Sequence, residues 1–201
     1  SKGFIHLMKA CQDKRNDSTG FSAQIHLSNI LHCEFNPCNK DIFVTCSIDG
    51  NAKVWDLRMF GRHNIKPLVV LTHRDPLNCA TFSPCGGETL LINNYFDQLT
   101  SYSTPDWRIE STFKHSHNQY HRFSIIKAKW HPSCKLILIG SSTSDINEVQ
   151  TVDVIDLKKK KIIANLTDGK LGVMPINDFN CTGDLIASAR GHNLVIFHSH
   201  L

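Results

Sequence analysis

The sequence predicts an all-β protein built from repeats of one unit, because four segments along it share one order of features. The segments read "FNPCNKDIFVTCSIDG", "FSPCGGETLLINNYFD", "WHPSCKLILIGSSTSD" and "FNCTGDLIASARGHN". Their leading aromatic residues, 47, 48 and 49 residues apart, are Phe35, Phe82, Trp130 and Phe179. A turn rich in Pro, Gly or Asn then leads into β-branched and apolar residues, which is the pattern of short antiparallel strands. A period in the high forties indicates a repeat architecture.

A further strand-like run follows each segment, and the first of these runs identifies the repeat. The runs read "NAKVWDLR", "QLTSYS", "VQTVDVID" and "NLVIFHS". Tyr102 follows Phe82 by 20 residues, as Trp55 follows Phe35, so the repeats share one register. Three or four short strands per unit are what a β-propeller blade requires, and the Trp55-Asp56 dipeptide in "VWDLR" is typical of the WD40 class. The predicted fold is therefore a WD40 β-propeller with blades of four antiparallel strands.

Four residues of the first repeat are predicted to hold its blade together. In the WD40 class, a histidine upstream of the Trp-Asp dipeptide forms a structural hydrogen-bond set with an aspartate in a turn. Here "QIH" supplies His26 and "IDG" supplies Asp49. With Trp55 and Asp56, these residues are interpreted as scaffold, because function lies in sites added to a fold.

The chain is predicted to form one partial WD40 domain, residues 1–201, with about four blades and the last strands of a preceding blade. WD40 propellers usually have more blades, so we expect a piece of a larger propeller with an open sheet edge at each end. The predicted parts are a blade tail with a linker at 1–20 and blades at 23–72, 73–113, 114–165 and 166–201.

Composition favours an ordinary globular protein with reduced thiols. Of the 201 residues 41% are hydrophobic and 20% charged, the net charge is +4, and no apolar run approaches the roughly 20 residues of a membrane helix. None of the eight cysteines lies in a CxxC pair, so we expect cytosolic or nuclear thiols without disulfides. The opening "SKGFIHLMKA" lacks an initiator methionine and a cleavage site. We therefore expect an internal or C-terminal piece of a non-secreted protein.

The stretch "FKHSHNQYHRFSIIKAKWHP", residues 113–132, combines histidines, basic residues and a tyrosine before a strand-like run. In a propeller, the loop entering a blade's innermost strand and the turn between its second and third strands open on one face. Residues 114–124, Asn29, Asn94 and Tyr95 are therefore predicted to share that face, and Arg58 to lie on the opposite one. The histidines would add positive charge below about pH 6.5.

Several of these stretches together resemble a known family. "NPCNKDIFVTCSIDGNAKVWDLR", "LTHRDPLNCATFSP", "HSHNQYHRFSIIKAKWHPSCKLILIG" and "FNCTGDLIASARGHNLVIF" are similar, in order and spacing, to the C-terminal half of the small WD40 subunit of UV-damaged-DNA-binding heterodimers. The resemblance implies a seven-bladed, nuclear propeller that serves as substrate receptor of a cullin-4 ubiquitin ligase. It would dock on the large triple-propeller subunit and recognise photolesions in nucleotide excision repair.

The resemblance also implies a short finger that enters the minor groove at the lesion, from which the damaged bases are flipped out. Tyr120 would supply the aromatic wedge, and neighbouring donors would hold phosphates and base edges. Here the finger reads Tyr-His-Arg where vertebrate relatives have a phenylalanine-led triplet, and Asn29 stands where the family typically has lysine. The residues predicted to bind DNA are Tyr120, His121, Arg122, Gln119, Lys114, Asn29 and Tyr95.

On the opposite face, Arg58 completes the pattern Trp55-Asp56-x-Arg58, which is found in many propellers that serve as cullin-4 receptors. An arginine there can donate two hydrogen bonds to a carboxylate or to carbonyl groups of the large subunit. The alternative is an arginine that forms a salt bridge only along the rim of its own blade.

Other chemistry is not indicated. The pairs His115/His117 and His198/His200 lack Cys or acidic partners at zinc-site spacing, and "KKKK" at 158–161 is interpreted as a solvated turn, with nuclear targeting or phosphate contact as the alternative. No phosphate loop, nucleophile elbow or catalytic carboxylate pair is found, so we expect no catalytic residue, metal or cofactor. Two alternatives to DNA binding stay open: a WD40 scaffold for proteins only, and a chromatin reader that binds histone tails.

Overall fold

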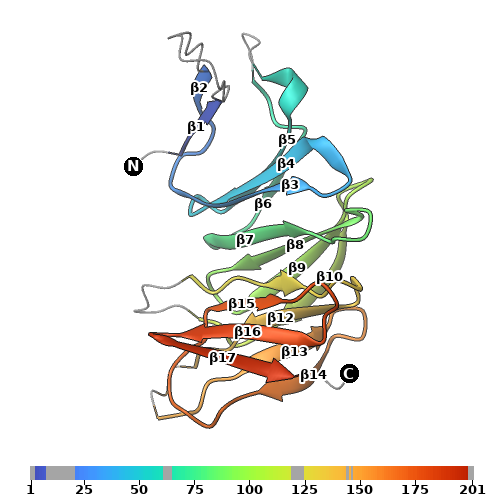
Figure 1. Ribbon diagram of the computed structural model, residues 1–201. Helices are drawn as coiled ribbons and strands as arrows, with labels where there is room; N and C mark the ends of the chain where they lie inside the picture. Colours follow the sequence, from blue (N-terminus) through green and yellow to red (C-terminus); the bar gives the residue numbers. More distant parts are fainter. Residues whose placement is uncertain are drawn as a thin grey trace, which may run out of the picture.

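The computed structural model describes residues 3–7, 21–60, 65–118, 125–143, 145 and 147–198. Their strands form five antiparallel sheets that follow one another in chain order (Figure 1). This arrangement confirms the predicted all-β WD40 propeller. The one helical element among the described residues is a 3-10 turn, and it is too short to cross a membrane.

Four of the sheets correspond to the four sequence repeats, and a two-stranded sheet precedes them. The opening pair is β1 (Phe4–Leu7) and β2 (Phe21–Gln24). The first sheet contains β3 (Ile30–Asn36), β4 (Asn39–Ser47), β5 (Asn51–Asp56) and β6 (Val69–Thr72), with the 3-10 turn η1 (Leu57–Met59) after β5. The second contains β7 (Leu77–Phe82), β8 (Thr89–Asn94), β9 (Gln98–Ser103) and β10 (Ile109–Lys114). The third contains β11 (Lys129–Trp130), β12 (Leu136–Gly140), β13 (Val152–Asp156) and β14 (Lys161–Leu166). The last has three described strands, β15 (Ile176–Phe179), β16 (Leu185–Arg190) and β17 (Asn193–His198).

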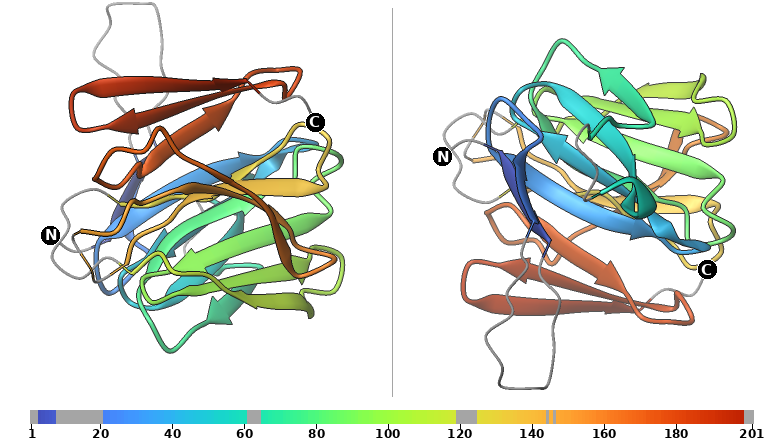
Figure 2. Two further views of the ribbon diagram at one scale, coloured as in Figure 1. Left: turned by 90° about the horizontal axis from the view of Figure 1, so that it is seen from below. Right: turned by 90° about the horizontal axis from the view of Figure 1, so that it is seen from above.

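Packing between sheets explains the composition of their strands. Every residue of β7 is buried, because β3 and β4 of the first sheet pack against it and the third sheet follows on the other side. The last sheet is the outermost layer at its end of the array (Figure 2). Its strand β17 therefore keeps Leu194 and Ile196 exposed, at 69% and 55%. Buried residues alternate with half-buried ones in β16, and exposed residues alternate with half-buried ones along 194–198 of β17, which reflects a sheet covered on one side only.

The hydrogen-bond set predicted around His26 and Asp49 is present. Nδ1 of His26 lies 3.0 Å from Oδ2 of Asp49, and its Nε2 lies 2.8 Å from Oγ1 of Thr45. The indole Nε1 of Trp55 donates to the same hydroxyl oxygen, also at 2.8 Å. Burial lowers the pKa of His26, against the attraction of Asp49. A neutral ring fits the geometry, because Nδ1–H then donates to Asp49 and Nε2 accepts from Thr45.

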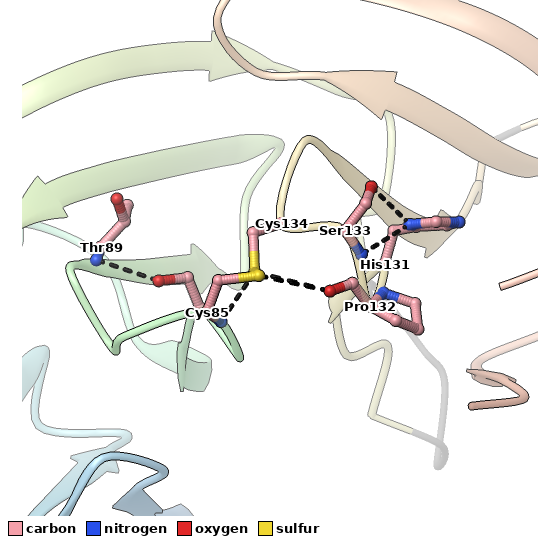
Figure 3. Close-up of a disulfide and its surroundings, with 7 residues drawn as sticks. Cys85, Thr89, His131, Pro132, Ser133 and Cys134 are labelled. Carbon is pink, nitrogen blue, oxygen red and sulfur yellow. Dashed lines mark hydrogen bonds between the residues drawn. A yellow bond between two sulfur atoms is a disulfide. The ribbon is translucent and has the colours of Figure 1, made fainter. Parts of the chain in front are cut away.

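The expectation that every cysteine is a free thiol is wrong for one pair. Cys85, in the turn between β7 and β8, forms a disulfide with Cys134, in the turn between β11 and β12 (Figure 3). The pair is 49 residues apart in sequence and 6.0 Å apart between Cα atoms. Because equivalent turns of successive repeats lie side by side, two cysteines in these turns fall within bonding distance. The disulfide ties the second sheet to the third.

Replacement of Thr45 by valine should destabilise the protein by about 1–3 kcal/mol, because the indole N–H of Trp55 and Nε2 of His26 would be left buried without a partner. Urea unfolding, monitored by tryptophan fluorescence, measures this change in the free energy of unfolding. Thr72→Val is the matched control, since Thr72 is an exposed residue of β6 whose hydroxyl donates to Oδ1 of Asn51. We expect a change within about 0.5 kcal/mol for the control. Equal losses for both variants would contradict a special role for Thr45.

Candidate nucleic-acid and adaptor interfaces

The loops that precede the first strand of each sheet, and the turns between second and third strands, form one continuous surface, which we call the finger face. Backbone hydrogen bonds tie these loops to the turns of the first sheet and of the second sheet, and the short connection 73–76 joins the two sets. They run from Ile48 N to Asn29 O (3.1 Å), His73 N to Gly50 O (2.8 Å), Tyr95 N to Pro76 O (2.8 Å) and His115 N to Asp97 O (3.0 Å). Asn29, Tyr95 and the segment that follows Lys114 therefore lie on one face, as the repeat geometry predicts.

Four predicted DNA-binding residues, Gln119, Tyr120, His121 and Arg122, lie outside the described residues. The chain before them, residues 115–118, is anchored on both sides. The backbone N of His117 donates to Oδ1 of Asp97 at 2.9 Å, in the turn between β8 and β9. On the other side Ser142, which follows β12, donates from its backbone N to Ser116 O and from its hydroxyl to Asn118 O, both at 2.8 Å. The second and third sheets together hold this segment.

Residues 126–128, which follow the predicted finger in sequence, are anchored to the same end of the second sheet. The side chain of Asn93, a fully buried residue of β8, donates through Nδ2 to Ile126 O at 3.0 Å and accepts through Oδ1 from Ala128 N at 3.4 Å. Ile126 and Ala128 are themselves buried. Residues 119–124 therefore begin and end on backbone that is fixed against the end of β8. Sequence analysis did not find Asn93; an amide in an otherwise apolar run, "LLINN", was the available signal.

The two histidines before the predicted finger are buried, which corrects the expectation that they supply surface charge. Nε2 of His115 lies 3.0 Å from Oδ2 of Asp153 in β13, and His117 is 0% exposed. The ring of His117 lies between two carbonyl oxygens, with Nδ1 2.7 Å from His115 O and Nε2 3.0 Å from Asn94 O. Burial, reinforced by His115, lowers the pKa of His117 to about 4. A neutral ring donates to one of these carbonyl oxygens, and this contact together with burial holds the loop in place.

The remaining predicted residues of the finger face differ in availability. Lys114 ends β10 and is exposed, and Asn29 is exposed in the loop before β3. Tyr95 is half-buried, with its ring centroid 5.4 Å from that of Phe96. Asn94 fills its turn, because Oδ1 accepts from two backbone N–H groups and Nδ2 donates to Asp75 at 3.0 Å. Tyr95 and Lys114 are therefore accessible side chains close in sequence to the anchored residues 115–118.

Two lysines of the stretch 113–132, Lys127 and Lys129, extend away from the finger face. Nζ of Lys127 lies 3.4 Å from Leu31 O in β3, and Nζ of Lys129 lies 3.5 Å from Oδ2 of Asp178 in β15. Both side chains thus extend toward the inner strands of other sheets. They contribute to packing between sheets instead of to the charge of the finger face.

The motif Trp55-Asp56-x-Arg58 lies on the opposite face, in and before η1, and we call this surface the Arg58 face. Trp55 is 2% exposed and Asp56 is buried, so neither offers a contact surface. The side chain of Arg58 is 67% exposed. It donates from Nη2 to Oδ2 of Asp56 at 2.6 Å and lies 3.8 Å from Asp41. These bonds lower the pKa of Asp56 and fix the guanidinium on the rim. Asp56 therefore positions Arg58, whereas Trp55 belongs to the hydrogen-bond set with Thr45 and His26.

No group of three His, Cys, Asp or Glu side chains suited to a metal occurs among the described residues. The close pairs His115/Asp153 and His26/Asp49 are each completed by hydroxyl, amide or backbone groups. Their geometry is that of structural hydrogen-bond sets.

Comparisons with known proteins identify relatives of this chain. The profile of the family described as "WD domain, G-beta repeat" matches residues 21–56. The chain is 34% identical over 186 residues to "DNA damage-binding protein 2" of Gallus gallus, with 87% of the chain and 36% of that protein covered. It is 32% identical over 183 residues to the protein of the same name from Danio rerio, with 89% and 37% covered. "Protein DAMAGED DNA-BINDING 2" of Arabidopsis thaliana is 25% identical over 210 residues, with 97% and 36% covered. The chain thus spans less than half the length of these relatives.

The buried histidines make stability dependent on pH. Burial lowers the pKa of His117 and of His32 to about 4, whereas an unfolded histidine titrates near 6.5. Between these values the unfolded chain binds protons that the folded chain does not, so stability is complete above about pH 6.5 and is lost as pH falls toward 4. The urea midpoint should stay nearly constant from pH 7.5 to about pH 6.5 and then fall toward pH 5.

His32→Asn separates this effect from general acid destabilisation. The variant removes one of the two rings whose pKa is lowered to about 4, and we expect a shallower fall of the urea midpoint between pH 6.5 and pH 5. A midpoint that stays constant over this range in the unmodified protein would contradict neutral, buried histidines.

Proposed function

We propose that the chain recognises damaged double-stranded DNA through the finger face, because a WD40 repeat profile matches its residues 21–56 and its relatives are named for binding damaged DNA. The contact residues would be those of the sequence "NQYHRF", with Lys114, Asn29 and Tyr95 around them. The protein would act in the nucleus, in nucleotide excision repair.

The anchoring of both ends of residues 119–124 supports this proposal most strongly. Two sheets hold residues 115–118, and the buried amide of Asn93 holds residues 126–128. A segment with fixed ends loses less conformational freedom on binding than a free one, so more of its contact energy remains as affinity. A minor-groove wedge needs fixed ends of this kind, because it must separate two stacked base pairs.

The chemistry of the segment fits selection by deformability. Tyr120 supplies aromatic area to fill the space left by an unstacked base, and Arg122 supplies a charged donor for phosphate or sugar. A lesion lowers the cost of unstacking and of flipping the base, so a wedge binds best where the duplex is already weakened. Recognition would therefore depend on damage more than on sequence.

The Arg58 face would carry a separate function, docking to the large triple-propeller subunit and through it to a cullin-4 ubiquitin ligase. Arg58 is exposed and held in place by Asp56. A partner carboxylate or carbonyl group could accept from a guanidinium oriented in this way. DNA and adaptor would then occupy opposite faces and could bind at the same time.

Tyr120→Ala in the full-length protein should lower affinity for lesion-bearing duplex roughly 10- to 100-fold, because stacking is worth about 1–3 kcal/mol per base. Binding to intact duplex should change little. Fluorescence anisotropy with the two duplexes measures both. If Tyr120→Ala weakens binding to both duplexes equally, the residue is no wedge. If neither affinity changes, the alternatives of a protein scaffold or a histone-tail reader take precedence.

Arg122→Ala should act differently, through the phosphate backbone. We expect it to weaken binding to damaged and intact duplex together and to reduce the slope of log affinity against log salt by about one. A salt titration of both duplexes provides the measurement. Loss confined to damaged DNA would assign Arg122 to the lesion instead.

Arg58→Ala should abolish co-purification with the large subunit while affinity for lesion-bearing duplex stays unchanged. The urea midpoint should also stay unchanged, because the guanidinium is solvent-exposed and its ion pairs contribute little to folding. Lys40→Ala, which changes another exposed cation of the first sheet, is the control. If the complex with the large subunit survives Arg58→Ala, Arg58 serves only the rim of its own blade.

A further inference from the structure

A cavity of about 300 Å³ opens between the second and third sheets, away from both predicted sites. Its walls include Trp130 and Leu157 as apolar groups and Glu110 as a carboxylate. Lys135, Lys158 and Lys160 complete the charged part of its lining. The turn that carries Leu157, Lys158 and Lys160 joins β13 to β14, which is the connection that in the first sheet carries Arg58. The cavity therefore opens on the Arg58 face.

The run of four lysines at 158–161 is divided by the turn. Lys159 is committed to Asp156, with its backbone N 2.9 Å from Oδ1 and its Nζ 3.5 Å from Oδ2. Lys158 and Lys160 line the cavity instead. Lys160 has a φ of 52°, a left-handed conformation that Gly or Asn adopts at less cost. Lys160 thus has a backbone conformation that is disfavoured for lysine, and the residue lines the cavity.

The charge of the cavity is unbalanced. Among the described residues, no carboxylate lies within 4.0 Å of the ammonium groups of Lys135, Lys158 or Lys160. The one carboxylate in the lining, Glu110, lies 3.4 Å from the hydroxyl of Thr89. Three ammonium groups against one carboxylate give the cavity an excess of positive charge. An anionic ligand would offset it.

The walls of the cavity are fixed before any ligand binds. The indole Nε1 of Trp130 donates to Thr81 O at 3.2 Å, and the hydroxyl of Ser111 donates to Leu157 O at 3.4 Å. Both bonds run between the second and third sheets. Cys134 also lines the cavity, and its disulfide to Cys85 holds its turn against the second sheet (Figure 3). A preformed site of this kind loses little freedom when it is occupied.

We infer that this cavity binds an acidic peptide segment of a partner protein. One apolar side chain of the peptide enters the cavity between Trp130 and Leu157, and flanking carboxylates pair with Lys135, Lys158 and Lys160. A volume of about 300 Å³ is at the lower end of ligand pockets and accommodates one or two side chains. A nucleic-acid backbone would need only the ammonium groups and would leave the apolar walls unused. The combination of apolar walls and cationic rim favours a peptide.

The test uses the full-length protein and a fluorescent peptide with a central leucine and two aspartates on either side. Fluorescence anisotropy measures its affinity for the unmodified protein and for two double variants. Lys158→Gln with Lys160→Gln should weaken binding about tenfold, because two ion pairs at a partly exposed site are lost. Lys159→Gln with Lys161→Gln removes the same charge from the same run but spares the cavity, and should change affinity less than about twofold. Lys135→Gln, in a different turn, should weaken binding severalfold.

Three results would overturn the inference. Equal losses in the two double variants would show a response to net charge alone. Equal binding of a peptide with serine in place of the leucine would show that the apolar walls are not used. A short thymidine oligonucleotide that competes as well as the peptide would show a general polyanion surface. The inference does not rest on DNA recognition, since Tyr120→Ala should leave peptide affinity unchanged, and failure of either idea is visible without the other.

Discussion

One polar contact, repeated from sheet to sheet, holds the array together. The residue that follows the outer strand of one sheet bonds to a strand or turn of the next sheet. The pairs are His26 with Asp49, His73 with Tyr102, His115 with Asp153, and Asp168 with Arg190. The first three contacts are largely shielded from water, whereas Asp168 in the fourth is exposed. In the shielded contacts, loss of one partner would leave the other without this hydrogen bond at considerable cost. Because every contact joins two sheets, no repeat completes its own structure alone.

The same contact is made with different chemistry in successive sheets. In the first sheet the hydroxyl of Thr45 connects Trp55 to His26. In the second sheet Ile92 stands at the position of Thr45, and the phenol of Tyr102 reaches His73 directly at 3.1 Å. The position is preserved while the side chains change. This explains why the WD repeat profile matches only residues 21–56 although the whole array has the fold.

Spacing alone was enough to predict the repeats, their register and the two faces, because strand alternation and turn residues repeat with the period of the fold. The set around His26 and Asp49 followed from one dipeptide. The burial of His115 and His117 did not follow, because the sequence does not mark where β10 ends, and its last residue, Lys114, is directly followed by the buried pair. Contacts between sheets depend on the relative position of repeats, which no single repeat encodes.

The disulfide and the partners of Lys127 and Lys129 are further contacts between sheets that the sequence of one repeat does not predict. Cys85 follows its leading aromatic residue by three positions and Cys134 by four, so an alignment of the turns brings them near each other only once neighbouring sheets are in register. Lys127 precedes β11 and Lys129 begins it, both alternating with the buried Ile126 and Ala128, and their partners, Leu31 and Asp178, belong to other sheets. The repeat period was enough to predict the strands, whereas the contacts between residues of different sheets could be found only in the three-dimensional structure.

The interface between the second and third sheets links the two faces of the molecule. At the finger face, Asn93 and Ser142 on its two sides hold the ends of the segment that contains Tyr120. At the Arg58 face, the same two sheets form the walls of the lysine-lined cavity. Between them, Trp130 donates across the interface to Thr81. A shift of one sheet against the other would therefore break the anchors at one face and change the cavity at the other. The disulfide and the buried polar bonds oppose such a shift, which keeps the base of the predicted finger rigid.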